Sequence, residues 1–132
     1  MENATTDVRA VLDTEVKPTD ELVTGRLDNG MRYAIMPNKL PPQRFEAHLE
    51  INAGSVDELP GEQGMAHLVE HVTFLGSKKR EGLLGTGARA NAYTDFHHTV
   101  FHVHAPLVNG VSGRPMLPQA SAVFHRGSCG AR

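Results

Sequence analysis

The sequence of 132 residues predicts a mixed α/β (α+β) domain of two layers, in which a sheet is covered by helix. Three stretches carry this prediction. Residues 22–36 have the pattern of two strands around a turn, residues 45–53 alternate apolar and polar side chains, and residues 65–75 place apolar side chains at helical spacing. A chain of this length is long enough to bury a core.

Composition and charge exclude several classes of protein. Hydrophobic residues make up 39% and charged residues 21%, as in globular proteins, and no apolar run is long enough to span a membrane. A net charge of −2 gives no indication of nucleic-acid binding. The single Cys129 cannot form an internal disulfide. The acidic N-terminal stretch resembles neither a signal peptide nor a transit peptide, so no targeting peptide is visible in this chain.

The N-terminal part of the chain predicts an arm and three strands. We expect residues 1–20 to be a flexible arm, with a short helical turn at residues 6–14. Strands at residues 22–27 and 31–36 follow, because the Asp28-Asn29-Gly30 sequence between them suits a tight hairpin turn. The third strand, at residues 45–53, has one apolar and one polar face, and His48 lies on the polar face as a surface histidine.

The predicted helix at residues 65–75 has two distinct sides. At about 100° per residue, one side is apolar, and the other carries His67, Glu70, His71 and Phe74. We expect the apolar side to pack on the core and the polar side to face a cleft, with Gly76 ending the helix as a cap. The residues of the apolar side are Met65, Leu68, Val69, Val72 and Leu75.

The polar side of this helix has the chemistry of a metal site. His67 and His71 are four residues apart, so one turn of helix brings both imidazoles to the same ion. Glu70 lies close to that ion without having to bind it. The spacing His-x-x-Glu-His is the inverted zinc-peptidase signature. Three polar residues on one side also occur on an ordinary solvated helix face, and spacing alone leaves that alternative open.

The remainder of the chain predicts one or two strands and a tail. Between residues 91 and 105, His98, His102 and His104 share one strand face, which suits either a half-exposed strand or a structural metal site, and the alternation favours the strand. Gly85-Thr86-Gly87 lacks the Gly-Lys-Ser/Thr ending of a phosphate loop. Residues 107–132 contain no acid and little periodicity, so we expect an irregular, disordered tail.

Together, two motifs resemble a known family. Gly64-x-x-His67-Leu68-Val69-Glu70-His71, followed by Gly87-x-x-x-Asn91-Ala92-Tyr93-Thr94, is similar to the pitrilysin-type inverted-zincin (HxxEH) metallopeptidases, and the resemblance covers roughly residues 20–106. Residues 74–80, 84–89 and 91–99 are similar in particular to the members that remove transit peptides from precursors in the chloroplast stroma.

The resemblance implies a fold, a cofactor and roles for particular residues. It implies a pitrilysin/LuxS-like two-layer domain, a zinc ion (Zn²⁺), and a polypeptide substrate such as a transit peptide or precursor protein. His67 and His71 match the zinc ligands, and Glu70 matches the carboxylate that activates the zinc-bound water. Asn91 and Ala92 match the strand edge to which the substrate backbone adds as an extra strand.

The chain departs from the family pattern in one ligand. The family's third zinc ligand is a glutamate on a later helix, whereas only Glu81 and Asp95 are acidic after His71, and neither is in that position. We therefore expect residues 21–106 to be part of an N-terminal peptidase domain, truncated. The chain is then a zinc metalloendopeptidase domain by resemblance, or else an inactive fragment or a peptide-binding module that uses the Asn91–Ala92 edge.

Overall fold

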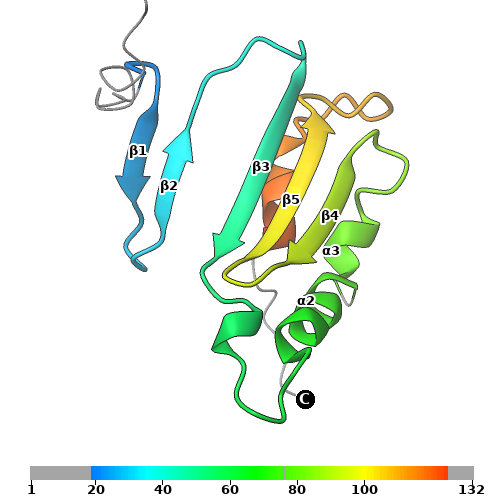
Figure 1. Cartoon of the computed structure of the whole chain (residues 1–132). Coiled ribbons are helices and arrows are strands. Elements are labelled where there is room, and N and C mark those ends of the chain that lie inside the picture. Colours follow the sequence, from blue (N-terminus) through cyan, green and yellow to red (C-terminus); the bar gives the residue numbers. More distant parts are fainter. Residues whose placement is uncertain (1–18, 76, 125–132) are drawn as a thin grey trace, which may run out of the picture. The chain divides into compact units, whose positions relative to one another are not determined.

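The computed structural model describes residues 19–75 and 77–124 (Figure 1). They fall into two units, divided between residues 39 and 40, which we describe separately. The helical turn expected at residues 6–14 and the cap expected at Gly76 lie outside the described residues. No helix in the described part of the chain is both long and apolar enough to cross a membrane.

The first unit contains the predicted hairpin. Strands β1 (Val23–Arg26) and β2 (Arg32–Ile35) pair antiparallel, with Gly25 opposite Tyr33. Their turn is closed by a hydrogen bond of 2.8 Å from the Leu27 amide to the Met31 carbonyl. Gly30 has a φ of +87°, which glycine adopts at little cost, so the Asp-Asn-Gly sequence accounts for the turn.

The second unit is built on an antiparallel sheet of three strands. Their spatial order is β3 (Arg44–Ile51), β5 (Thr99–Pro106) and β4 (Arg89–Thr94), so that β5 lies in the centre (Figure 1). The register places Ala47 and Ala90 on either side of Val103. Because side chains alternate along a strand, this register gives the sheet one apolar and one polar face. The predicted strands in these regions are confirmed.

The core lies on the apolar face and uses the C-terminal segment. Val103 and Ala105 of β5 pack with Leu83, Met116 and Ala120, all of which are buried. Helix α4 (Leu117–Ser121) and the 3-10 turn η2 (Ala122–Phe124) follow.

The prediction of an irregular tail at residues 107–132 was therefore wrong for the part that the structure describes, residues 107–124. The Met116 amide donates to the Leu107 carbonyl at 2.9 Å, and Val108 forms an isolated bridge with Pro115. The segment is rich in proline and glycine, and its helix is too short to show periodicity in the sequence. Only Met116 and Ala120, four residues apart, mark its buried side.

Helix α2 (Met65–Leu75) follows the 3-10 turn η1 (Ser55–Asp57) and precedes the short helix α3 (Lys78–Glu81). Its range agrees with the prediction, but its orientation does not. The side with Glu70 and Phe74 is buried, and the Phe74 ring lies 6.3 Å from the ring of Phe101 on β5. The five residues expected in the core are 47–67% exposed: Met65, Leu68, Val69, Val72 and Leu75.

The physical reason for this reversal lies in the neighbours of the helix. Periodicity identifies the two sides of a helix, but the side that is buried depends on what the fold supplies to pack against it. Among the described residues, α2 contacts β4 and β5, and the aromatic ring of Phe74 meets the sheet. The His–Glu–His group consequently lies between helix and sheet, while the apolar side faces away from the sheet.

Candidate active site

The N-terminus of α2 is fixed by an acid upstream in the sequence. The Glu58 carboxylate accepts hydrogen bonds from the amides of Gly64 at 2.8 Å and Ala66 at 2.9 Å. These amides have no partner within the helix, and a negative charge there also offsets the helix dipole. Sequence reasoning missed Glu58, because its spacing of six and eight residues differs from the three of a capping box.

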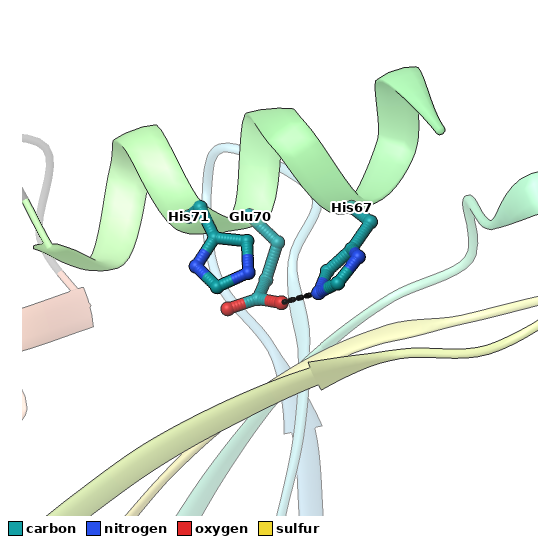
Figure 2. A group of neighbouring side chains, drawn as sticks. All are labelled: His67, Glu70 and His71. Carbon is teal, nitrogen blue, oxygen red and sulfur yellow. Dashed lines mark ion pairs between the residues drawn. The ribbon is translucent and has the colours of Figure 1, made fainter. Parts of the chain in front are cut away.

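Three side chains of α2 converge toward the sheet (Figure 2). The rings of His67 and His71 have centroids 4.4 Å apart, and Nε2 of His67 lies 3.7 Å from Oε2 of Glu70. One ligand atom from each of the three lies within 4.8 Å of the other two. Two imidazoles one turn apart and a carboxylate between them suit a zinc ion, which binds nitrogen and oxygen ligands of this kind.

The three groups differ sharply in exposure. The side chain of His67 is 64% exposed, whereas that of Glu70 is 5% exposed. The imidazoles can therefore be reached by an ion from solvent, while the carboxylate is shielded from solvent. A buried carboxylate beside two accessible nitrogen ligands suits proton transfer at a metal site.

Neither of the downstream acids joins this group. Among the residues that the structure describes, the possible metal-binding cluster contains His67, Glu70 and His71, and it includes neither Glu81 nor Asp95. Within the described residues, Glu70 is thus the one acid that joins the two imidazoles in this group.

The three histidines of β5 and its preceding turn do not form a metal-binding group within the described residues. His98 lies 3.5 Å from Glu50, His102 stacks on His48 at 5.6 Å, and His104 accepts a hydrogen bond from Arg44. His102 and His104 are half-buried, as the strand interpretation of the sequence predicts.

The strand edge predicted to capture substrate lies beside α2. Strand β4 is at the margin of the three-stranded sheet and contacts α2, and its outer edge pairs with no other described strand. Ala92 pairs with Phe101, so its side chain is on the helix side, whereas Asn91 pairs with His102 on the opposite face. The structure thus separates the side chains of Asn91 and Ala92, which share only the backbone edge.

An open pocket of about 290 Å³ joins this edge to the helix. Its lining comes from the end of β4, the N-terminal end of α2 and the loop before it: Ser55, Glu58, Gly64, His67, Thr94, Asp95 and Phe96. Of these residues, only His67 was predicted from the sequence to belong to the site. The pocket depends on residues 40 positions apart meeting in space, for which the sequence gives no direct signal.

Backbone contacts hold the two walls of this pocket together. The amides of Ser55 and Val56 donate to the carbonyls of Asp95 at 3.0 Å and Phe96 at 2.9 Å. Gly54 permits this approach, since a Cβ atom there would lie 2.5 Å from the carbonyl oxygens of Asp95 and Phe96. Glycine at residue 54 is therefore required by contact distance.

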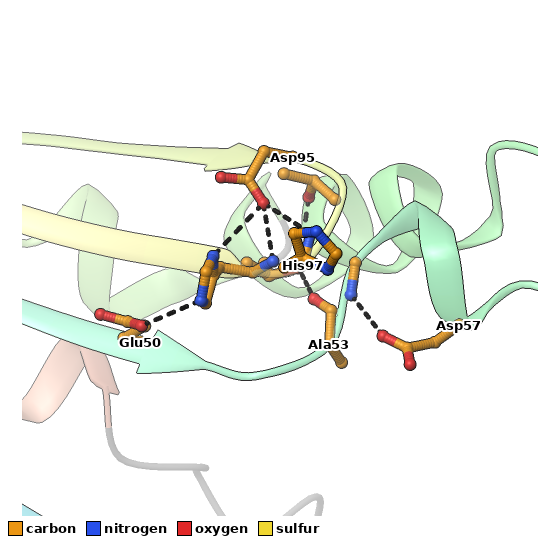
Figure 3. A network of polar contacts seen from close by, with 9 residues as sticks. Glu50, Ala53, Asp57, Asp95 and His97 are labelled. Atoms are coloured by element: carbon orange, nitrogen blue, oxygen red, sulfur yellow. Dashed lines mark hydrogen bonds and ion pairs between the residues drawn. The ribbon is translucent and has the colours of Figure 1, made fainter.

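The turn that ends β4 is organised by Asp95 (Figure 3). Its Oδ1 atom accepts hydrogen bonds from the amides of His97 at 2.8 Å and His98 at 2.7 Å, and the Thr99 hydroxyl donates to the Ala53 carbonyl at 2.9 Å. The two amide hydrogen bonds lower the pKa of Asp95 below its ordinary value, because they stabilise the charged form. Asp95 therefore has a structural role in the pocket wall.

Comparison with known proteins places this geometry in a family. Residues 33–120 match the family model described as Insulinase (Peptidase family M16). The chain belongs to this peptidase family. The match confirms the pitrilysin-type resemblance and the fold class, and it runs beyond residue 106, where the resemblance seen in the sequence ended.

The M16 chain has relatives in plants and bacteria. It is 62% identical over 112 residues to the chloroplastic stromal processing peptidase of Arabidopsis thaliana, and 58% identical over 112 residues to that of Oryza sativa subsp. indica. Each match covers 85% of this chain and 9% of the relative. It is 38% identical to the probable zinc protease PqqL of Escherichia coli, over 81% of this chain and 12% of PqqL.

The solved structures agree with these relatives. The first half of the periplasmic protease PqqL from Escherichia coli has a TM-score of 0.67 at 34% identity, covering 84% of this chain and 25% of that one. The M16 chain thus spans about a tenth of the length of the curated relatives it matches. The fold of its described part is that of an M16 protease, and the family to which it belongs contains named zinc proteases.

Proposed function

We propose that this chain is a zinc metalloendopeptidase domain that hydrolyses peptide bonds in polypeptide substrates. The observation that carries the proposal is the group on α2, where two accessible imidazoles flank a carboxylate that is only 5% exposed. Membership of family M16 and relatives named as zinc proteases support it.

Each residue of the group has a distinct role in the proposed reaction. His67 and His71 are the zinc ligands, and their spacing on one helix side presents both rings to one ion. In catalytic sites, bound zinc lowers the pKa of a water molecule to about 7 and polarises carbonyl oxygens. Glu70 accepts a proton on its carboxylate from the attacking water and passes it to the nitrogen of the leaving amine.

The outer edge of β4 is the proposed substrate-binding element. The backbone at Asn91 and Ala92 pairs with an extended peptide, whose main-chain hydrogen bonds provide affinity without strict sequence preference. The contact of β4 with α2 and the pocket at the end of the strand support this placement. A side chain of the bound peptide enters the pocket lined by His67 and Phe96.

The proposed substrates are transit peptides or precursor proteins, and the proposed location is the chloroplast stroma. Both come from the plant relatives, which are named chloroplastic stromal processing peptidases. The match at 58% identity extends over 112 of the 132 residues and therefore spans α2 and β4, which supports a substrate of the same class.

The decisive test is the zinc content of the purified chain. We expect about one zinc per chain, lost in His71→Ala and retained in His48→Ala, because His48 lies on the polar face of the sheet away from α2. Equal zinc content in the protein and in His71→Ala would show that the metal, if any, binds elsewhere.

A second candidate is a peptide-binding module without catalysis. It is favoured by one observation: among the described residues, no acid other than Glu70 joins the two histidines. In this case, an extended peptide binds the β4 edge equally well with and without a metal chelator. If binding needs zinc and is followed by cleavage, the peptidase function holds.

A further inference from the structure

On the sheet face opposite α2, we infer a binding site for an oxyanion of the carboxylate or phosphate class. An open pocket of about 360 Å³ lies there, lined by two arginines, a histidine and two backbone segments: Arg44, Arg89, His104, Gly87 and Ala88. It is separate from the group on α2, and the inference does not rest on the peptidase function.

The sheet register brings the three charged or polar side chains together. Arg89 of β4 pairs with His104 of β5, and Arg44 of β3 pairs with the last residue of β5, Pro106. Along β3, Arg44 shares its face with His48 and alternates with Phe45, which packs against the core. One residue from each strand thus points to the same corner of the polar face.

Hydrogen bonds fix the position of one guanidinium before any ligand arrives. Nε of Arg44 donates to Nε2 of His104 at 2.9 Å, and Nη2 donates to the Gly87 carbonyl at 3.1 Å. Because Nε2 of His104 accepts, the imidazole carries its proton on Nδ1 and remains a possible donor. A guanidinium has five N–H donors in a fixed plane, so Arg44 keeps donors for a ligand after these two bonds.

The charge around this pocket is not balanced by the protein. In the part of the chain that the structure describes, neither Arg44 nor Arg89 forms an ion pair with a carboxylate; the acids on this sheet face, Glu46 and Glu50, lie by His48 and His98. Two guanidiniums beside one pocket repel each other, and a bound anion removes this repulsion. Glu46 is the nearest competing acid in the register, opposite His104, and its carboxylate lies 3.1 Å from Nε2 of His48.

The geometry of the donors selects the class of ligand. Planar guanidinium groups bind carboxylate and phosphate oxygens in pairs of parallel hydrogen bonds, which a monatomic anion cannot form. The Nδ1 proton of His104 adds a neutral donor next to the charge, and Gly87 and Ala88 add backbone surface to the pocket. An oxyanion with at least two oxygens therefore fits better than chloride.

The test is a titration of the full chain, followed by the backbone amide signals of residues 87–89 in two-dimensional NMR spectra. The probes are inorganic phosphate, chloride, and a short peptide with either a free or an amidated C-terminus. We expect saturable shifts with phosphate or with the free carboxylate, and none with chloride. Saturation by phosphate alone identifies a phosphate site. Saturation by the peptide with a free C-terminus, but not by the amidated peptide, identifies a carboxylate site, and either result supports the inference.

Matched variants separate a built site from general surface charge. Arg89→Gln removes an exposed guanidinium without disturbing the core. We expect the dissociation constant for the oxyanion to be about tenfold higher in this variant than in the unchanged protein, and the value for Arg89→Lys to lie between the two. Arg114→Gln removes an exposed arginine in the 107–116 segment and should leave binding unchanged. Equal weakening by Arg114→Gln, or no saturable shift with any oxyanion, would overturn the inference.

Discussion

Nε2 of His67 lies 3.7 Å from Oε2 of Glu70, three residues later on the side of α2 that faces the sheet. The contact joins a ring that is mostly exposed to a carboxylate that is almost fully buried. Helical spacing alone explains why the two groups are neighbours. Packing against the sheet explains why they differ in exposure, and this difference fits the separate roles of metal ligand and proton acceptor.

Replacing Glu70 by glutamine should separate these roles. Glu70→Gln keeps the size of the side chain but removes its ability to accept a proton, so hydrolysis of a test peptide should fall by at least about 100-fold. His67 and His71 remain, so zinc content should be retained. The measurement is peptide cleavage by the zinc-loaded chain, with zinc counted on the same sample. Normal cleavage by the glutamine variant would remove Glu70 from the mechanism.

The orientation of α2 makes a prediction about stability. Phe74 is buried against Phe101 and lies 4.6 Å beneath the Arg80 guanidinium, so Phe74→Ala should lower the free energy of unfolding by about 3 kcal/mol. Val72 is 67% exposed, so Val72→Ala should change it by no more than about 0.5 kcal/mol. Urea denaturation of both variants tests this. The opposite ranking would mean that the apolar side of α2 is the buried one.

The sequence predicts much of this architecture, because its signals are local. Asp28-Asn29-Gly30 specifies a hairpin turn, and alternation around His48 specifies a strand with one polar face. Helical spacing identifies His67, Glu70 and His71 as one group, and the structure brings their ligand atoms together.

What the sequence does not predict depends on contacts between distant segments. The buried side of α2 is determined by its contact with the ring of Phe101 on β5. Met116 is buried because it packs with Val103 and Ala105 of the same strand. Glu58 caps α2 across a loop, at a spacing that no local motif describes. The pocket beside His67 exists only because Ser55 and Asp95 hydrogen bond across the unit. Such relationships require the fold before they can be seen.

Asp95 should make stability depend on pH at the acidic end. In the folded chain, the pKa of Asp95 is lowered below its ordinary value of 3.8, chiefly by the hydrogen bonds from the amides of His97 and His98. A depressed pKa means that the stabilisation is fully present above the unfolded value and is lost as pH falls through the lower folded value. Asp95→Asn should therefore lower the free energy of unfolding at pH 7, and this free energy should depend less on pH below about pH 4 than it does in the unchanged protein.

The measurement for Asp95 is the urea midpoint of the protein and of the variant between pH 2 and pH 7. Asp20→Asn, which replaces an exposed acid in the first unit, is the matched control and should leave the curve unchanged. Parallel curves for the protein and Asp95→Asn across the acidic range would contradict the assigned role of the turn.

Gly54 should be the least replaceable glycine near the site. A methyl group there would lie 2.5 Å from backbone carbonyl oxygens of Asp95 and Phe96, and backbone atoms cannot rotate away as a flexible side chain can. Gly54→Ala must therefore separate the loop from the turn, weaken the bonds made by the Ser55 and Val56 amides, and lower the free energy of unfolding by about 1–3 kcal/mol. Gly110→Ala is the matched control, since nothing lies within 4 Å of its Cβ position.

Because the same bonds hold the wall beside His67, Gly54→Ala should also weaken binding of an extended peptide while the zinc content is unchanged. If the two alanine variants are equally stable in urea, the contact between Gly54 and the Asp95 turn does not hold the pocket together.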